Sequence, residues 1–90
     1  MFDLNGFAKQ SYEVAKQRGT VNAETMLKHC ATEVVEAVQA KNAESRQNYI
    51  GELADVINCI LILSANENID IEMALTQCLE KNTKRVQEGK

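Results

Sequence analysis

Residues 32–56 read TEVVEAVQAKNAESRQNYIGELADV, and this stretch decides how the rest of the chain is interpreted. It contains two acidic pairs, Glu33 with Glu36 and Glu52 with Asp55. In an α-helix this spacing places both carboxylates of a pair on nearly the same face, about one turn apart. In an antiparallel helical hairpin, the residue numbers of two residues that lie level with each other always add up to the same sum. Glu36 with Glu52 and Glu33 with Asp55 give equal sums, so both pairs can lie level in one hairpin. We therefore expect four carboxylates to converge between two helices, which requires cations.

The composition of the whole chain is that of one small all-α domain spanning residues 1–90. The sequence has no proline and only four glycines, which favours uninterrupted helices. A domain of 90 residues has only a modest core, and association is a common way to enlarge it. The net charge of −3 argues against a nucleic-acid partner, because binding a phosphate backbone takes a clustered basic surface.

Apolar periodicity predicts four helices. The first covers residues 3–18, and the boundaries after it are Gly19, the polar connection 42–47 and the polar break 66–68, with Gly89 ending the last helix. Side-chain N-caps are expected at Asn22, Ser45 and Asp70. The connection 42–47 is short enough to turn near Glu44, so the second helix, which continues to about Lys41, and the third helix form an antiparallel hairpin.

The third helix is predicted to need cover on every side. One face should bury Ile50, Leu53, Ala54, Ile57 and Leu61, while further apolar surface comes from Val56, Ile60, Ile62 and Leu63. The second helix should bury the stripe Leu27, Cys30, Ala31, Val34 and Val38, with Glu33 and Glu36 beside it. Three other short helices cannot cover an all-round apolar helix. We expect a second copy to complete the bundle, as a homodimer or homotetramer.

The chain carries no sequence signal for export or for a membrane anchor. Residues 1–10 lack the basic and apolar regions of a signal peptide. The longest mostly apolar run, residues 56–65, is shorter than the ~20 residues needed to cross a bilayer. Cys30, Cys59 and Cys78 lie on apolar helical faces without a C-x-x-C pair, and we interpret them as reduced core thiols. A cytoplasmic protein without a membrane partner is expected.

Two observations set the four acids apart from an ordinary solvated helix face. One is the matched register, and the other is that no Lys or Arg occurs between Arg46 and Lys81. Carboxylates without nearby counter-charge either raise their pKa values or bind metal. Oxygen ligands favour Mg²⁺, with Mn²⁺ as a substitute. Because one divalent ion cannot neutralise four carboxylates, we expect either more than one ion or an ion that arrives with its substrate.

Basic residues return near the end of the fourth helix. Lys81 and Arg85 share a helical face, a spacing that can hold a polyphosphate. Asn82 lies on the apolar stripe of this helix, where a buried amide would need a partner such as a phosphate or sugar oxygen. The alternative is that the basic residues only compensate the negative end of the helix dipole.

The order Glu33-x-x-Glu36, spacer, Glu52-x-x-Asp55, followed by Lys81-Asn82-x-x-Arg85, resembles the MazG-like all-α nucleoside triphosphate pyrophosphohydrolases over roughly residues 22–86. The resemblance implies four-helix protomers that assemble, bind Mg²⁺ through the four acids, and split a nucleoside triphosphate into monophosphate and pyrophosphate. It also implies that Lys81, Asn82 and Arg85 contact the substrate.

The chain departs from the family pattern at two points. Thr32 stands where many members have an acid, so either Glu33 or Glu36 would be the catalytic residue that orients the attacking water. The chain has no tryptophan, which several members use near the base, so base preference does not carry over. Two alternatives stay open: a phosphoribosyl-ATP pyrophosphohydrolase, and a helical interaction module without turnover.

Overall fold

The computed structural model describes residues 2–43 and 45–89, and these residues form four α-helices. Their bounds are α1 Leu4–Arg18, α2 Ala23–Ala43, α3 Arg46–Asn66 and α4 Ile71–Gln87. The described residues include no strand, so the predicted all-α class is confirmed. The predicted turn residue Glu44 lies outside them.

Each helix begins where a short polar side chain can cap it. The carboxylate of Asp3, the amide of Asn22, the hydroxyl of Ser45 and the carboxylate of Asp70 each accept a hydrogen bond from the backbone N–H three residues further on. The donor–acceptor distances are 2.9, 3.0, 3.2 and 3.0 Å in the same order. Such bonds satisfy N–H groups that have no partner inside the helix. The three N-caps predicted from the sequence are therefore confirmed.

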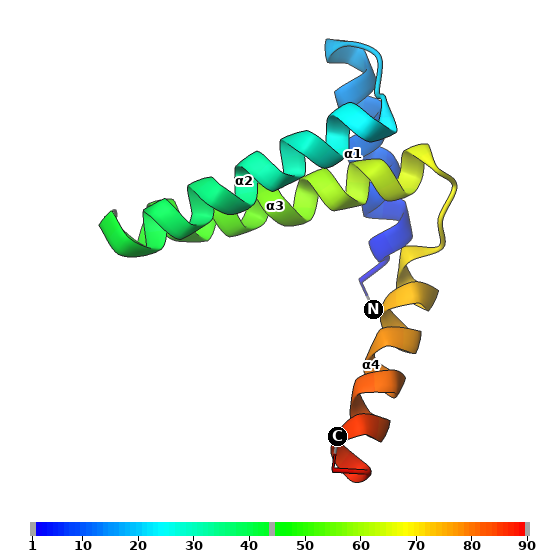
Figure 1. The fold of residues 1–90 in the computed structure, drawn as a ribbon. Coiled ribbons are helices and arrows are strands. Elements are labelled where there is room, and N and C mark those ends of the chain that lie inside the picture. Colours follow the sequence, from blue (N-terminus) through cyan, green and yellow to red (C-terminus); the bar gives the residue numbers. More distant parts are fainter. Residues whose placement is uncertain (1, 44, 90) are drawn as a thin grey trace.

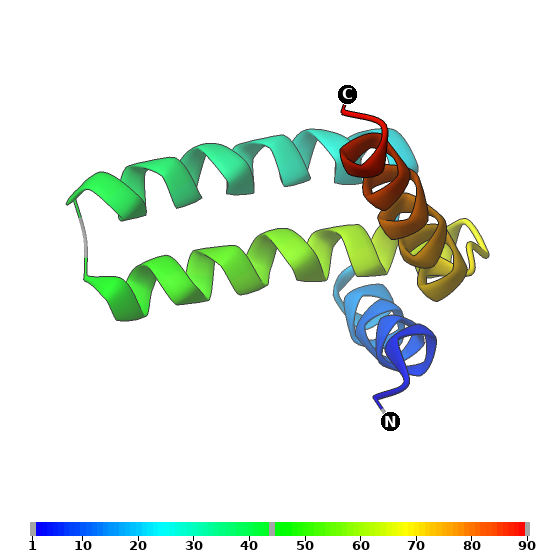
Figure 2. The ribbon, with the colours of Figure 1, turned by 90° about the horizontal axis from the view of Figure 1, so that it is seen from below.

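Helices α2 and α3 form the predicted hairpin and lie side by side along their length, as Figures 1 and 2 both show. Helix α1 crosses the end of the hairpin where α3 finishes, and α4 extends away from the hairpin (Figure 1). The radius of gyration is 15.2 Å, whereas a compact domain of this length would have about 12 Å. The single chain is thus an open arrangement of helices.

The core of the single chain is small and lies between α1, α2 and α3. Its buried apolar members are Ala8, Cys30, Ala37, Ala40, Cys59, Leu61 and Ile62. The predicted burial is confirmed for Leu61 and Cys30 but not for most of the two stripes. The exposed fraction is 41% for Leu53, 58% for Ile57 and 47% for Val34. The reason is geometric, because α3 is covered by α2 on one side and by α1 at one end, and no other described element covers its remaining surface.

Helix α4 is attached to the rest of the chain at its N-terminus. Asn5 of α1 donates a hydrogen bond to Asp70 at 2.8 Å and accepts bonds from the N–H groups of Ile71 and Glu72 at 3.0 and 3.3 Å. Glu72 in turn accepts a bond from the N–H of Leu4 at 2.8 Å. The first turns of α1 and α4 therefore cap each other. Beyond this contact α4 buries no side chain.

Helix α3 is longer and more apolar overall than the run 56–65 suggested. It has 21 residues, and its most apolar 18-residue window has a mean hydropathy of 1.3. Only 22% of that window is buried inside the structure. By length and composition alone such a helix could cross a bilayer, and core helices of globular proteins pass the same test. The expectation of no membrane partner therefore stays a prediction, and it now rests on Glu52 and Asp55 within the helix, since intramembrane acids are costly.

Candidate metal centre and its surroundings

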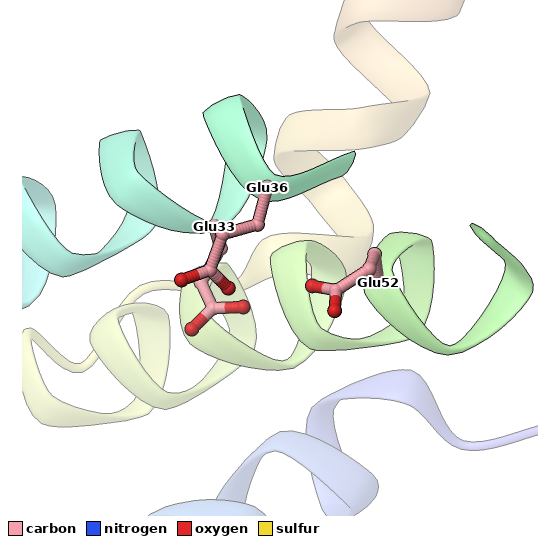
Figure 3. Close-up of side chains that lie close together, drawn as sticks. All are labelled: Glu33, Glu36 and Glu52. Atoms are coloured by element: carbon pink, nitrogen blue, oxygen red, sulfur yellow. The ribbon is translucent and has the colours of Figure 1, made fainter. Parts of the chain in front are cut away.

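Three of the four predicted carboxylates converge between α2 and α3. Glu33 and Glu36 project from α2 and Glu52 from α3, as Figure 3 shows. One oxygen from each of the three side chains lies within 4.8 Å of the others. Glu36 and Glu52, which the constant sum placed level with each other, are both in this group. We call these three residues the acidic cluster.

Asp55 lies one helical turn beyond Glu52 and is not part of the acidic cluster. Its side chain is exposed, and together with Glu33 it lines a cavity next to the cluster. The structure thus places Asp55 beside the three carboxylates without bringing its oxygen atoms among theirs. Its role as a metal ligand stays a prediction.

The position of Glu33 differs from the one predicted beside the buried stripe. Only 9% of Glu33 is exposed, because this residue lies on the face of α2 that turns toward α3. Its Oε1 atom is 3.1 Å from Nε2 of His29, which sits one turn earlier on α2. This contact fixes one end of the carboxylate, and Glu36 on the next turn is exposed. The acidic cluster therefore combines one carboxylate held in place with one that is open to solvent.

Two buried thiols, Cys30 and Cys59, lie close together, and Cys59 is near Glu33 and Asp55. Burial, the neighbouring Cys30 and the negative charges of Glu33 and Asp55 together raise the pKa of Cys59 to about 12. Cys30 and Cys59 are both buried and free, which agrees with the interpretation as reduced core thiols. Cys78 is also free but is exposed on α4, so the predicted core position was wrong for this residue.

The basic end of α4 is far from the acidic cluster within one chain. Lys81, Asn82 and Arg85 are exposed, and α4 points away from the hairpin (Figure 1). The prediction that Asn82 is buried was wrong, because α4 buries no residue, and its amide donates instead to Sγ of Cys78 at 3.7 Å. A single chain therefore does not bring the predicted phosphate-contacting residues to the predicted metal ligands.

Sequence reasoning missed the cavity that opens beside the acidic cluster. Its volume is about 580 Å³, and it lies between the end of α1, the start of α2 and the second half of α3. Arg18, His29 and Asn58 are among its polar lining residues. The sequence did show Arg18 directly before Gly19, which ends α1, and both residues line this cavity. The cavity could not be predicted from them, because apolar periodicity does not give the direction in which α1 crosses the hairpin.

The donor set of the acidic cluster fits a hard divalent cation. Three carboxylates supply only oxygen ligands, which Mg²⁺, Mn²⁺ and Ca²⁺ prefer. The Oε2 atom of Glu52 is buried, so part of the cluster is shielded from water. Among the described residues, neither Glu33 nor Glu36 forms an ion pair with a Lys or Arg. The cluster is therefore an acidic site to which a cation can be added.

Four helices with carboxylates gathered inside a hairpin agree with the class that the sequence resembles, the MazG-like all-α pyrophosphohydrolases. Within this class, the family model for phosphoribosyl-ATP pyrophosphohydrolase matches residues 8–82. The chain belongs to this family, and the resemblance seen in the sequence is confirmed. The match includes the acidic cluster, Asp55 and Asn82 but ends before Arg85. No curated protein and no solved structure gives a match. Family membership makes the chain a pyrophosphohydrolase of nucleotide-like substrates.

Proposed function

We propose that this protein hydrolyses a nucleoside triphosphate group between its α- and β-phosphates and releases pyrophosphate. The observation that carries the proposal is the convergence of Glu33, Glu36 and Glu52 from two helices in a member of this family. Mg²⁺, or Mn²⁺ in its place, would be held by these residues and Asp55, and when bound it would neutralise phosphate oxygens and activate water.

The protein's own groups would place the reactants. Glu33 is buried and oriented by His29, so it can hold a fixed direction toward a bound water or ligand. Glu36 is exposed and can reach the same space from the next turn. Both stay candidates for the residue that orients the attacking water and accepts its proton.

A second copy of the chain would supply the basic residues. Lys81, Asn82 and Arg85 stand on a helix whose apolar residues are uncovered, with exposed fractions of 52% for Leu75 and 68% for Leu79. The same is true of Val34 and Leu53 on the hairpin. Packing α4 of one chain on the hairpin of another would cover both surfaces and bring positive charge to the acids.

Light scattering tests this assembly. A homodimer or homotetramer at micromolar concentration is the expected result, and a stable monomer would reject the shared site. If Arg85 contacts phosphate, Arg85→Ala should lower kcat/KM about ten- to a hundredfold without weakening Mn²⁺ binding in the absence of nucleotide. Unchanged hydrolysis would reject the phosphate contact and leave the metal site standing.

The choice of substrate lies between a plain nucleoside triphosphate, which the sequence favoured, and phosphoribosyl-ATP, which the name of the family favours. Pyrophosphate release should be measured with phosphoribosyl-ATP and with a panel of ribo- and deoxyribonucleoside triphosphates, each with Mg²⁺ and with a chelator. Release from at least one substrate that stops with the chelator supports the proposal. No release from any of them would favour the helical interaction module.

A further inference from the structure

Cys30 on α2 and Cys59 on α3 form a buried pair of thiols that the proposed function does not use. Their exposed fractions are 8% and 6%, and their side chains are close enough to share a hydrogen bond. Among the described residues, no His, Cys, Asp or Glu joins both thiols in a group close enough to hold one ion. The pair therefore lacks the four ligands of a structural zinc site. What two adjacent thiols can do without a metal is form a bond with each other.

The register of the hairpin places the two cysteines nearly level. Their residue numbers add up to one more than the sum shared by Glu36 and Glu52, which corresponds to an offset of about 1.5 Å along the helix axes. Both cysteines are buried, and α2 packs mainly on α3. Each thiol therefore faces the other helix at almost the same height.

Small side chains let the backbones of α2 and α3 approach closely on this face. Among the described residues, the apolar side chains that α2 buries are those of Cys30, Ala37 and Ala40. Helix axes about 8–10 Å apart, with Cα atoms about 2.3 Å from each axis, bring facing Cα atoms to about 3–6 Å. A disulfide joins Cα atoms about 4–7 Å apart. The packing therefore allows the two sulfur atoms to bond with little movement of the helices.

A small oxidant can reach one thiol of the pair, because Cys59 lines the cavity of about 580 Å³ beside the acidic cluster. The sulfur of Cys59 attacks one oxygen of hydrogen peroxide, the O–O bond breaks, and water leaves with the proton of the thiol. The sulfur of Cys30 then attacks the resulting sulfenic acid, the S–O bond breaks, and a second water leaves. Two thiols are oxidised to one disulfide, and one peroxide is reduced to two molecules of water.

We propose that Cys30 and Cys59 are a redox site, at which a peroxide joins α2 to α3 by a disulfide that a dithiol reduces again. The crosslink lies one turn from Glu33, so it fixes α2 against α3 beside the acidic cluster. It also closes the hairpin into a loop in the unfolded chain, which stabilises the folded chain. Burial, the largest cause that raises the pKa of Cys59, leaves little thiolate, so the disulfide forms slowly and only under sustained exposure to the oxidant. The site does not depend on the proposed activity.

The full chain with Cys78→Ser tests the proposal, because this change removes the exposed thiol that could link two molecules. After prolonged exposure of the folded protein to excess hydrogen peroxide, mass spectrometry should show the loss of two hydrogen atoms and a joined pair of tryptic peptides that contain Cys30 and Cys59. Dithiothreitol should reverse both changes. Circular dichroism at a fixed protein concentration should give an unfolding temperature on the order of 10–25 °C higher for the oxidised chain than for the reduced chain.

Cys30→Ser in the same Cys78→Ser chain is the matched control, since it leaves Cys59 without a partner. Peroxide should not raise the unfolding temperature of this control, and an equal rise would show that the effect does not come from the pair. The chain that keeps both core thiols decides the question even if the control fails to fold. The proposal is overturned if both thiols are still alkylated after unfolding, if oxygen is added without a crosslink, or if the crosslink leaves the unfolding temperature unchanged.

Discussion

Replacing Glu52 by glutamine should make the metal-free protein more stable while weakening its response to metal. The ligand oxygen atoms of Glu33, Glu36 and Glu52 lie within 4.8 Å of one another. Two unit charges at that distance repel by about 0.9 kcal/mol in water and about 3.5 kcal/mol at an effective dielectric constant of 20. Glu52 faces two such neighbours, and Glu36 is exposed, so we take the value near the water limit. The expected gain in free energy of unfolding is about 1–2 kcal/mol.

Thermal unfolding followed by circular dichroism, at one fixed protein concentration, measures this effect. In a chelator, Glu52→Gln should unfold on the order of 5–15 °C above wild type. With Mg²⁺ at about a hundred times its dissociation constant, the wild-type protein should gain about 2.7 kcal/mol and the variant less than half of that. Glu80→Gln removes an exposed acid of α4 outside the acidic cluster and serves as the control. A variant that unfolds below wild type in chelator, or that responds to Mg²⁺ as wild type does, would refute the reasoning.

Three further results are expected. The largest cause that lowers the pKa of Asp70 below its ordinary value of 3.8 is the hydrogen bond from Asn5, and the next is the bond from the backbone N–H of Met73. The stability that this contact contributes is therefore present above pH 3.8 and is lost as the pH falls through the lowered pKa. Asn5→Ala should raise this pKa in an NMR titration, and an unchanged value would contradict the contact. A thiol reagent at pH 8 should label exposed Cys78 at once and buried Cys59 only slowly, because the raised pKa keeps the Cys59 thiol protonated. Equal labelling rates for the two thiols would show that the core around Cys59 is open to solvent. Leu61→Ala should lower the free energy of unfolding by about 2–5 kcal/mol in a urea titration, as for other buried leucines, and a loss below about 1 kcal/mol would show that this position is not core.

Local interactions explain why much of the fold was predictable from the sequence. The caps at Asn22, Ser45 and Asp70 depend on hydrogen bonds to groups three residues away. The hairpin register depends on a short connection and on apolar periodicity, so the level pairing of Glu36 with Glu52 could also be predicted.

Burial was harder to predict because periodicity reports the apolar face of a helix but not the neighbour that covers it. Val34 and Leu53 lie on predicted core faces and are exposed in the single chain, while Glu33 turns toward α3. The direction of α4 depends on contacts between Asn5 and the turn before it, more than 60 residues away, and no local pattern indicates such a contact. For the same reason the sequence did not place Arg18 at the rim of a cavity.

The bond between Asn5 and Asp70 also bears on the order in which the chain folds. The two residues are 65 positions apart, so joining them closes most of the 90-residue chain into one loop. Closing so long a loop costs entropy before other contacts offset it, whereas α2 and α3 need close only a short connection. The hairpin should therefore form first and the α1–α4 contact last. Loss of the Asn5 side chain should then accelerate unfolding and leave the rate of folding nearly unchanged.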